Sequence, residues 1–359
     1  MRFGLILTIS VLAIHLVSDA QDNVIAKQKL SASSTVSTTF GRTSSIKTQF
    51  AGPINGGHVA CDSNGNLYAR RVPFEDMTRP APVQEIRPDG TVGRSFSVSD
   101  ASPSYISPVA GFFVGSKGEV FILAWSNTPG QSRSQAFVLA FGSDGGLRST
   151  IQVDAPDDVE PYQVAVFRSG EILLSGQRGQ DGHTPFIGVF NQNGKLIREV
   201  YEPEDEDLRK RAEAGETKLL FHSSNYGNLA AADGRAVVGS DGNIYVMRKT
   251  SPALIYRISP RGEVTGKMQV DAGDSRLEAS SLQSAAGRIA VLFHGFVHGT
   301  GENLLRVVDL NGNLIASYDS LSDGLPAGAL GCYAPPSVTF LTGGNNPGDM
   351  IQLNRFEAR

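Results

Sequence analysis

The chain has 359 residues, with 32 lysines and arginines against 36 aspartates and glutamates, which gives a formal net charge of -4. Charges of both signs are interspersed, so the sequence lacks the basic patch on which nucleic-acid binding depends. Glycine accounts for 40 of the residues. That content is expected of a chain that reverses direction in many tight turns.

The first twenty residues have the pattern of a secretory signal peptide. Met1-Arg2 gives a positive start, residues 3–17 are nearly all apolar, and Ser18-Asp19-Ala20 offers small residues where a signal peptidase reads. The apolar run is shorter than the roughly 20 residues needed to span a bilayer, which favours a cleaved signal over a membrane anchor. We expect cleavage after Ala20 and a secreted or periplasmic monomer with no membrane span.

A repeating unit begins near residue 41, after a lead at 21–40 that is rich in Ser, Thr, Lys and Gln and is expected to be flexible. Each unit has an apolar run, a turn built on glycine, and an alternating apolar run, and it recurs about every fifty residues. The turns are Asn64-Gly65, Lys117-Gly118, Ser169-Gly170, Asp241-Gly242 and Ala286-Gly287. A repeat of this length that is built only from strands is typical of a β-propeller blade.

A second series of turns predicts an outer hairpin, so each blade holds four antiparallel strands, lettered A at the axis to D at the rim. These turns are Asp89-Gly90, Asp144-Gly145, Asn193-Gly194, Arg261-Gly262 and Asn311-Gly312. Asp-Gly and Asn-Gly between alternating runs are the strongest short hairpin signals, since both central residues can take positive φ. The two series give five complete blades, at about 54–98, 108–153, 161–201, 232–270 and 280–319.

Only three strands remain at the C-terminus, at 329–333, 337–342 and 350–356. A three-stranded last blade would expose an unpaired edge, which proteins avoid. The first ordered strand, at about 45–50, is the candidate for the missing position. We therefore predict an all-β, six-bladed propeller over 41–359, closed by the N-terminal strand completing the C-terminal blade.

Residues 202–231 interrupt the period between the third and fourth blades and begin with an acidic run. Long insertions in repeat proteins usually map to one face, which is often the binding face. The segment is interpreted either as part of the rim of a binding site or as a solvated loop with a short helix.

The two cysteines, Cys61 and Cys332, occupy the same position of strand A in the first and sixth blades, which become neighbours when the ring closes. An exported protein permits a disulfide between them. A bridge requires Cα atoms within about 7 Å, however, and equivalent inner-strand positions of adjacent blades can lie farther apart. A disulfide and a pair of buried free thiols both remain open at this stage.

The pattern DSNGNLY at 62–68, repeated as GSDGNIYV at 239–246, resembles the inner hairpin of NHL-repeat propellers. The second turn of that repeat is similar to ISPRG at 258–262 and VDLNG at 308–312. The chain thus resembles the superfamily of six-bladed NHL-repeat and TolB-like propellers. The resemblance implies a fold and no single activity, because such propellers include lactonases, lyases, binding modules and scaffolds.

The catalytic residues of these enzymes have no match here. The calcium-dependent lactonases hold their metal with a Glu, two Asn and an Asp, whereas the equivalent positions in this chain are about Asn55, Pro108 and Asp233, with Glu160 close by. The His and acidic residues that streptogramin lyases place around magnesium are not matched either. The resemblance therefore assigns no catalytic residue and no metal ligand.

The strongest candidates for a binding site are polar residues at the starts of the A strands, which line the central channel of a propeller. Counting back from the inner turns places His58, Tyr162, Gln163, Asp233 and Arg235 at one mouth. Such a ring would bind a small polar or anionic ligand, with Arg235 as a fixed cation. The alternative is a solvated pore lining whose residues hydrogen-bond to one another.

The favoured function is an exported, non-catalytic propeller that binds a protein or a small ligand at the channel mouth. No Gly-x-Ser-x-Gly elbow precedes a helix and no Gly-x-Gly-x-x-Gly loop opens one, so neither a serine hydrolase nor a nucleotide-binding protein is indicated. The main alternative is a metal-assisted hydrolase or lyase, lactonase-like or streptogramin-lyase-like, at the central channel. An exported scaffold is a third. No cofactor is evident from the sequence, and a divalent metal belongs to the enzyme alternative.

Overall fold

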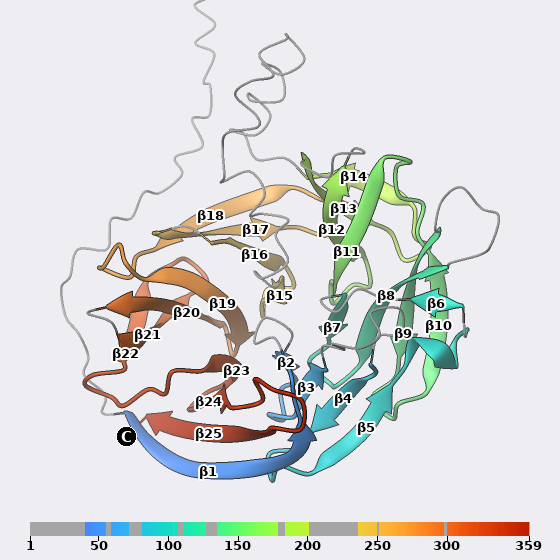
Figure 1. Ribbon diagram of the computed structural model, residues 1–359. Helices are drawn as coiled ribbons and strands as arrows, with labels where there is room; N and C mark the ends of the chain where they lie inside the picture. Colours follow the sequence, from blue (N-terminus) through green and yellow to red (C-terminus); the bar gives the residue numbers. More distant parts are fainter. Residues whose placement is uncertain are drawn as a thin grey trace, which may run out of the picture.

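The computed structural model describes residues 40–54, 59–71, 81–102, 104–106, 111–126, 135–178, 184–200, 236–249, 251–297 and 300–358. The strands in these ranges form six sheets. Figure 1 shows the innermost strands β2, β7, β11, β15, β19 and β23 gathered around a common axis, with the other strands outside them. The protein is a six-bladed β-propeller, as predicted. No helix in the described ranges is long and apolar enough to cross a membrane.

Each sheet is one blade of antiparallel strands that run in order from the axis to the rim. Blade 1 contains β2 (Val59–Cys61), β3 (Leu67–Arg70), β4 (Val83–Ile86) and β5 (Val92–Phe96), followed by the short helix η2 (Val98–Asp100). Blade 2 contains β6 (Tyr105–Ile106), β7 (Phe112–Val114), β8 (Val120–Ser126), β9 (Gln135–Phe141) and β10 (Leu147–Gln152). Its inner strand is in two pieces, because β6 and β7 both pair with β8.

The next three blades follow the same order. Blade 3 contains β11 (Val159–Val166), β12 (Ile172–Arg178), β13 (Thr184–Phe190) and β14 (Leu196–Glu199). Blade 4 contains β15 (Val237–Val238), β16 (Ile244–Arg248), β17 (Ala253–Ile258) and β18 (Val264–Val270). Blade 5 contains β19 (Glu278–Ala285), β20 (Arg288–Val297), β21 (Thr300–Asp309) and β22 (Leu314–Asp319). The predicted insertion at 202–231 and the segments at 1–20 and 21–39 lie outside the described residues.

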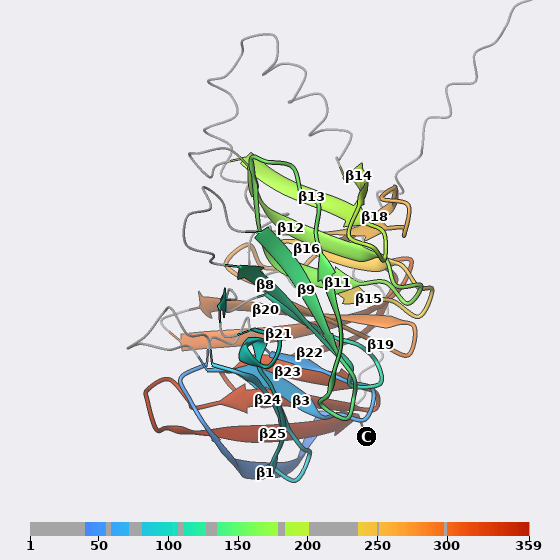
Figure 2. The ribbon, with the colours of Figure 1, turned by 90° about the vertical axis from the view of Figure 1, so that its right-hand side faces the viewer.

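Blade 6 joins the two ends of the chain. It contains β23 (Ala329–Ala334), β24 (Ser337–Thr342), β25 (Met350–Ala358) and, as its outermost strand, β1 (Phe40–Ala51). β1 pairs antiparallel with β25 in a register that sets Ile46 opposite Leu353. Both views show these two strands side by side (Figures 1 and 2). The predicted closure is confirmed, and the closing strand is longer than the expected 45–50.

Aromatic contacts at both ends of β1 add to its backbone pairing. Phe40 stacks on Tyr318 of blade 5, with ring centroids 4.0 Å apart, and on Phe356 of blade 6, at 5.6 Å. At the other end Phe50 is fully buried in the cluster that joins blade 6 to Val59 and Leu67 of blade 1. β1 therefore contacts three consecutive blades of the ring.

In the described Asp-Gly and Asn-Gly turns the glycine takes a positive φ and the residue before it does not. In the turn at 62–66, Gly65 donates to the Asp62 carbonyl at 3.2 Å, and only the glycine takes a positive φ, at 80°. The Asp62 carboxylate explains this geometry, since its Oδ1 accepts from the backbone N–H groups of Asn64 and Asn66 at 2.9 and 3.0 Å. These bonds favour a turn closed by one left-handed glycine. Within the described ranges, Ala286 (φ 49°) before Gly287 (φ 72°) is the case in which both central residues take positive φ.

The hydrophobic core lies between the blades, and successive residues of a strand serve different interfaces because side chains alternate across a sheet. In blade 4, for example, Tyr245 packs toward blade 5 and its neighbour Ile244 packs toward blade 3. This arrangement fills the interfaces between blades and leaves the axis to be lined mainly by the A strands and their turns.

Cys61 and Cys332 form a disulfide between strand A of blade 1 and strand A of blade 6, with Cα atoms 5.4 Å apart. Cys332 is 2% exposed, whereas Cys61 is half-buried. The bridge joins the two blades beside the strand closure, so two different bonds hold the same seam of the ring.

We expect Phe50→Ala to destabilise the ring strongly. The side chain is fully buried where β1 meets blade 1, and truncating a buried Phe costs about 3–5 kcal/mol of unfolding free energy. Gln49→Ala, at the exposed neighbouring position, is the matched control and should change stability by less than about 0.5 kcal/mol. Denaturant unfolding measures both, and equal stability of the two variants would contradict the closing role of β1.

We also expect no titratable thiol in the unreduced, denatured protein. The cysteines are 271 residues apart, and in the chain-entropy account a loop of that length contributes more than about 4 kcal/mol. Cys61→Ala combined with Cys332→Ala should therefore lower the melting temperature clearly. Two reactive thiols per native chain, or an unchanged melting temperature in the double variant, would be the contrary result.

Candidate functional site

A cavity of about 730 Å³ lies on the propeller axis, toward the end where each A strand turns into its B strand. All six blades line it. The lining residues are 60–63, 112–117, 119, 121, 163, 164, 166–168, 236–238, 240, 282–286 and 333–335. Its volume is within the range of small-molecule sites, and a central position shared by several elements is typical of them.

Gln163 of β11 supplies the most informative polar group. The residue lines the cavity and is 9% exposed. Its Oε1 accepts a hydrogen bond from the Ser175 hydroxyl at 3.3 Å. Its Nε2 is buried and has no hydrogen-bond partner among the described residues. Leaving a buried donor unpaired costs about 1–3 kcal/mol, so an acceptor bound in the cavity would recover free energy there.

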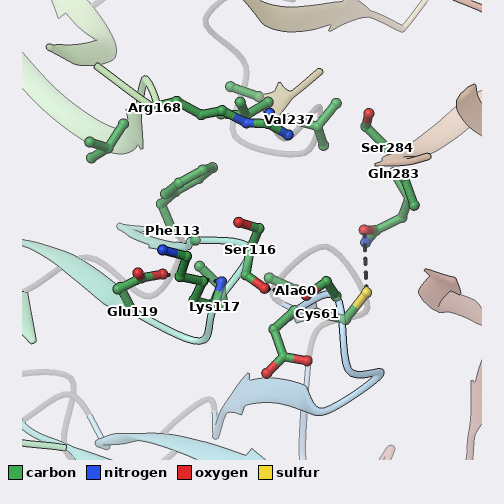
Figure 3. Close-up of a pocket in the computed structure, with 18 of the residues that line it drawn as sticks. Ala60, Cys61, Phe113, Ser116, Lys117, Glu119, Arg168, Val237, Gln283 and Ser284 are labelled. Atoms are coloured by element: carbon green, nitrogen blue, oxygen red, sulfur yellow. Dashed lines mark hydrogen bonds between the residues drawn. The ribbon is translucent and has the colours of Figure 1, made fainter. Parts of the chain in front are cut away.

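Gln283 of β19 lines the cavity from blade 5 and is 8% exposed. Figure 3 shows its amide reaching toward Cys61, where Oε1 lies 3.9 Å from the cysteine Sγ. A sulfur in a disulfide carries no hydrogen and donates nothing to this oxygen. The hydrogen-bonding capacity of the Gln283 amide is therefore left for the cavity.

Two cations stand at the inner turns that border the cavity. Lys117 and Arg168 precede the turn glycines of blades 2 and 3, and both side chains are exposed. Figure 3 shows Arg168 extending toward Val237 of blade 4, and its Nη1 donates to the carbonyl of Ser240 at 3.2 Å. The remaining N–H groups of the guanidinium and the Lys117 ammonium form no hydrogen bond or ion pair with other described residues.

The two carboxylates of the lining are engaged in the turns themselves. Asp62 is 4% exposed, and besides its two backbone bonds its Oδ2 accepts from Asn66 Nδ2 at 2.9 Å and from the Tyr68 hydroxyl at 3.2 Å. Burial together with this carboxylate raises the pKa of Tyr68 far above its ordinary value. Glu119 Oε2 accepts from the backbone N–H of Lys117 at 3.2 Å. Asp62 in particular is a structural part of its turn.

Phenyl groups form an apolar part of the wall. Phe113 and Phe121 of blade 2 lie with ring centroids 6.2 Å apart, and both line the cavity. Phe167 of blade 3, which is 2% exposed, and Leu282 of blade 5 extend this surface. The cavity thus combines an apolar wall with amides in its interior and two cations at its turn end.

The sequence-predicted site overlaps this cavity at one residue. Gln163 lines it, whereas the adjacent Tyr162 is half-buried and is not part of the lining. Burial raises the pKa of Tyr162 to about 12, and the negative charge of Glu160 adds to the shift. His58, Asp233 and Arg235 lie outside the described residues, so the ring at the opposite ends of the A strands stays a prediction.

Sequence reasoning missed Gln283, Lys117 and Arg168. It looked for polar residues at the starts of the A strands, and these three lie at or near the ends of those strands. Arg168 and Lys117 could have been found from the sequence, since each lies one or two residues before a glycine of the inner turn series. The role of Gln283 can be seen only when blade 5 and blade 1 are brought together around the axis, where its amide approaches Cys61.

The described residues contain no group of three or more His, Cys, Asp or Glu side chains arranged to hold a metal ion. His294, from the HGFVH segment at 294–298, lies on β20 and pairs with Glu278. Its Nδ1 is 2.7 Å from Asn303 Oδ1 and therefore donates to it. The His294 Nδ1 is therefore engaged in a hydrogen bond within blade 5.

Comparison with known proteins supports the fold and adds no activity. No family profile matches the chain, and no curated protein matches it. A Dyadobacter fermentans protein of unknown function is 10% identical, overlays with a TM-score of 0.51, and covers 89% of this chain and 100% of its own. An α-L-arabinanase of Penicillium chrysogenum, solved with arabinobiose, is 11% identical with a TM-score of 0.44, over 88% of this chain and 99% of its own. At 10% identity the first of these overlays shows a shared fold alone.

We expect the double variant Gln163→Leu with Ser175→Ala to be more stable than the natural protein by about 1 kcal/mol in the absence of ligand. The pair removes the unpartnered amide donor together with the hydroxyl that would otherwise lose its acceptor. Gln135→Leu is the matched control, because Gln135 Nε2 donates to the Val153 carbonyl at 2.7 Å. That control should lose stability in denaturant unfolding; a loss of the same size in the double variant would show that the Gln163 amide is satisfied.

Proposed function

We propose that this protein is an exported, non-catalytic β-propeller that binds a small ligand in the axial cavity. The observation that carries the proposal is the buried Gln163 amide, whose Nε2 has no partner in the described structure and which lines a cavity of about 730 Å³. A structural glutamine would be expected to have both of its amide groups paired. A binding site keeps such a group available for its ligand.

Two features support export. Residues 1–20 have the charge and hydropathy pattern of a signal peptide. The Cys61–Cys332 disulfide is of the kind that persists in oxidising compartments. Both features agree with a mature protein that acts outside the cytoplasm.

The lining favours binding over catalysis. Among the lining residues of the described structure there is no histidine, and of the two carboxylates Asp62 accepts three hydrogen bonds from its own turn and one from Tyr68 of β3. General acid–base catalysis needs a group that is free to exchange a proton with the substrate. The metal-assisted hydrolase or lyase remains the alternative.

We expect a panel of small polar compounds, screened by thermal shift and native mass spectrometry, to contain one that binds with a stoichiometry of one. Ser284→Trp should weaken binding of that compound by more than about tenfold, since the indole would fill the cavity that Ser284 lines. Ser149→Trp, on the exposed outer strand of blade 2, is the control and should bind normally. Unchanged binding in Ser284→Trp, or no binding by any compound, would refute the proposal.

Chelation separates the two functions. If the protein is a non-catalytic binder, dialysis against EDTA should leave ligand affinity unchanged. If the metal-assisted enzyme is correct, chelation should abolish binding or turnover of the compound, and added divalent cation should restore it.

A further inference from the structure

We infer that the ligand of the axial cavity is an organic anion with an apolar body, whose anionic group is held at the turn end by Lys117 and Arg168. This inference rests on the proposed function and specifies its ligand class. It follows from the balance of donors and acceptors around the cavity, from the position of the charges, and from the apolar wall.

The available polar groups of the cavity are dominated by donors. Gln163 Nε2 is unpartnered among the described residues, and Lys117 and Arg168 carry N–H groups with no described acceptor. The acceptors of greatest strength, the Asp62 and Glu119 carboxylates, already receive hydrogen bonds from their own turns. A ligand that supplies acceptors and negative charge therefore complements this lining, and a cationic ligand does not.

The two positive charges stand at the same end of the cavity. Lys117 and Arg168 come from the inner turns of neighbouring blades, and both border the same cavity. The bond from Arg168 Nη1 to the Ser240 carbonyl fixes the guanidinium along the rim and leaves its other nitrogens free to donate. A guanidinium and an ammonium in this arrangement suit a carboxylate or a phosphate, since hydrogen bonds between ionised partners are roughly twice as strong as neutral ones.

The apolar wall of the cavity indicates that the rest of the ligand is apolar. Phe113 and Phe121 present ring surface in the same cavity, and burying apolar surface of a ligand against them favours binding. Simple inorganic anions would leave this surface without a contact. The whole protein carries a net charge of -4, so general attraction cannot account for selective anion binding.

A pair of dyes with the same body tests the inference. Anilinonaphthalene sulfonate is an aromatic anion, and phenylnaphthylamine is its uncharged parent. We expect the folded protein to bind the anion at least about tenfold more tightly than the parent. Arg168→Gln and Lys117→Gln should each weaken binding of the anionic dye by about tenfold. Each variant should bind the uncharged parent with an affinity within about twofold of that of the natural protein. Fluorescence titration measures the affinity of each dye for the natural protein and for both variants.

Lys47→Gln is the matched control, because it removes one positive charge from the exposed face of β1 and should leave both dyes unaffected. Displacement of the bound anion by an aryl carboxylate or by an aryl phosphate of the same body identifies which anionic group fits better. Displacement by the corresponding alcohol with equal strength would overturn the inference.

The remaining outcomes distinguish this inference from the proposed function. Equal binding of the two dyes, unaffected by Arg168→Gln and Lys117→Gln but blocked by Ser284→Trp, would refute the anion and leave the binding cavity in place. Loss of anion binding in Lys47→Gln as well would show that net charge alone is responsible. Failure of both dyes, together with failure of the compound screen, would refute the cavity as a site.

Discussion

The pairing of β1 with β25 is the constraint on which the rest of this structure depends. It joins residues more than 300 positions apart in the sequence, such as Ile46 and Leu353, and it covers the edge that a three-stranded sixth blade would expose. The chain itself connects each blade to the next, from blade 1 to blade 6, so the ring is closed by this one seam. The Cys61–Cys332 bridge joins the same two blades near the axis. The seam is therefore held by a covalent bond at its inner end and by strand pairing at its outer end.

The site is a consequence of how the blades pack. Side chains on the two faces of each blade fill the interfaces between blades, as Ile244 and Tyr245 do, and the inner edges of these clusters reach the axial cavity. The A strands and their turns therefore decide what the cavity presents. The Asp62 carboxylate binds the backbone of its own turn, so its oxygens are engaged there, while the exposed cations of the turns stay available. The donor-rich character of the cavity thus follows from the turn chemistry.

The repeat of glycine turns was sufficient to predict the fold, because period and strand-only composition admit few other architectures. The closing strand was also predictable, because a three-stranded last blade would leave an unpaired strand edge. The conformation of the turns was not, because Asp62 bonds to Asn64 and Asn66 and holds all but the glycine at negative φ. The cavity was predicted in part. Gln163 follows from strand position, but Gln283 and Cys61 approach each other only through contacts between separate blades.

Strand β2 takes part both in the closure of the ring and in the lining of the proposed binding site. Cys61 of β2 belongs to the disulfide, to the cavity lining and to the contact with Gln283. A ligand seated against Gln283 and Gln163 would therefore contact the bonded seam between blades 1 and 6 from within, while β1 holds it from outside. Because any molecule that binds only the folded state stabilises it by mass action, occupation of the cavity and integrity of the seam are energetically linked. An anionic ligand would add attraction to Lys117 and Arg168 on blades 2 and 3, so that its contacts extend over blades which the closing strand does not reach.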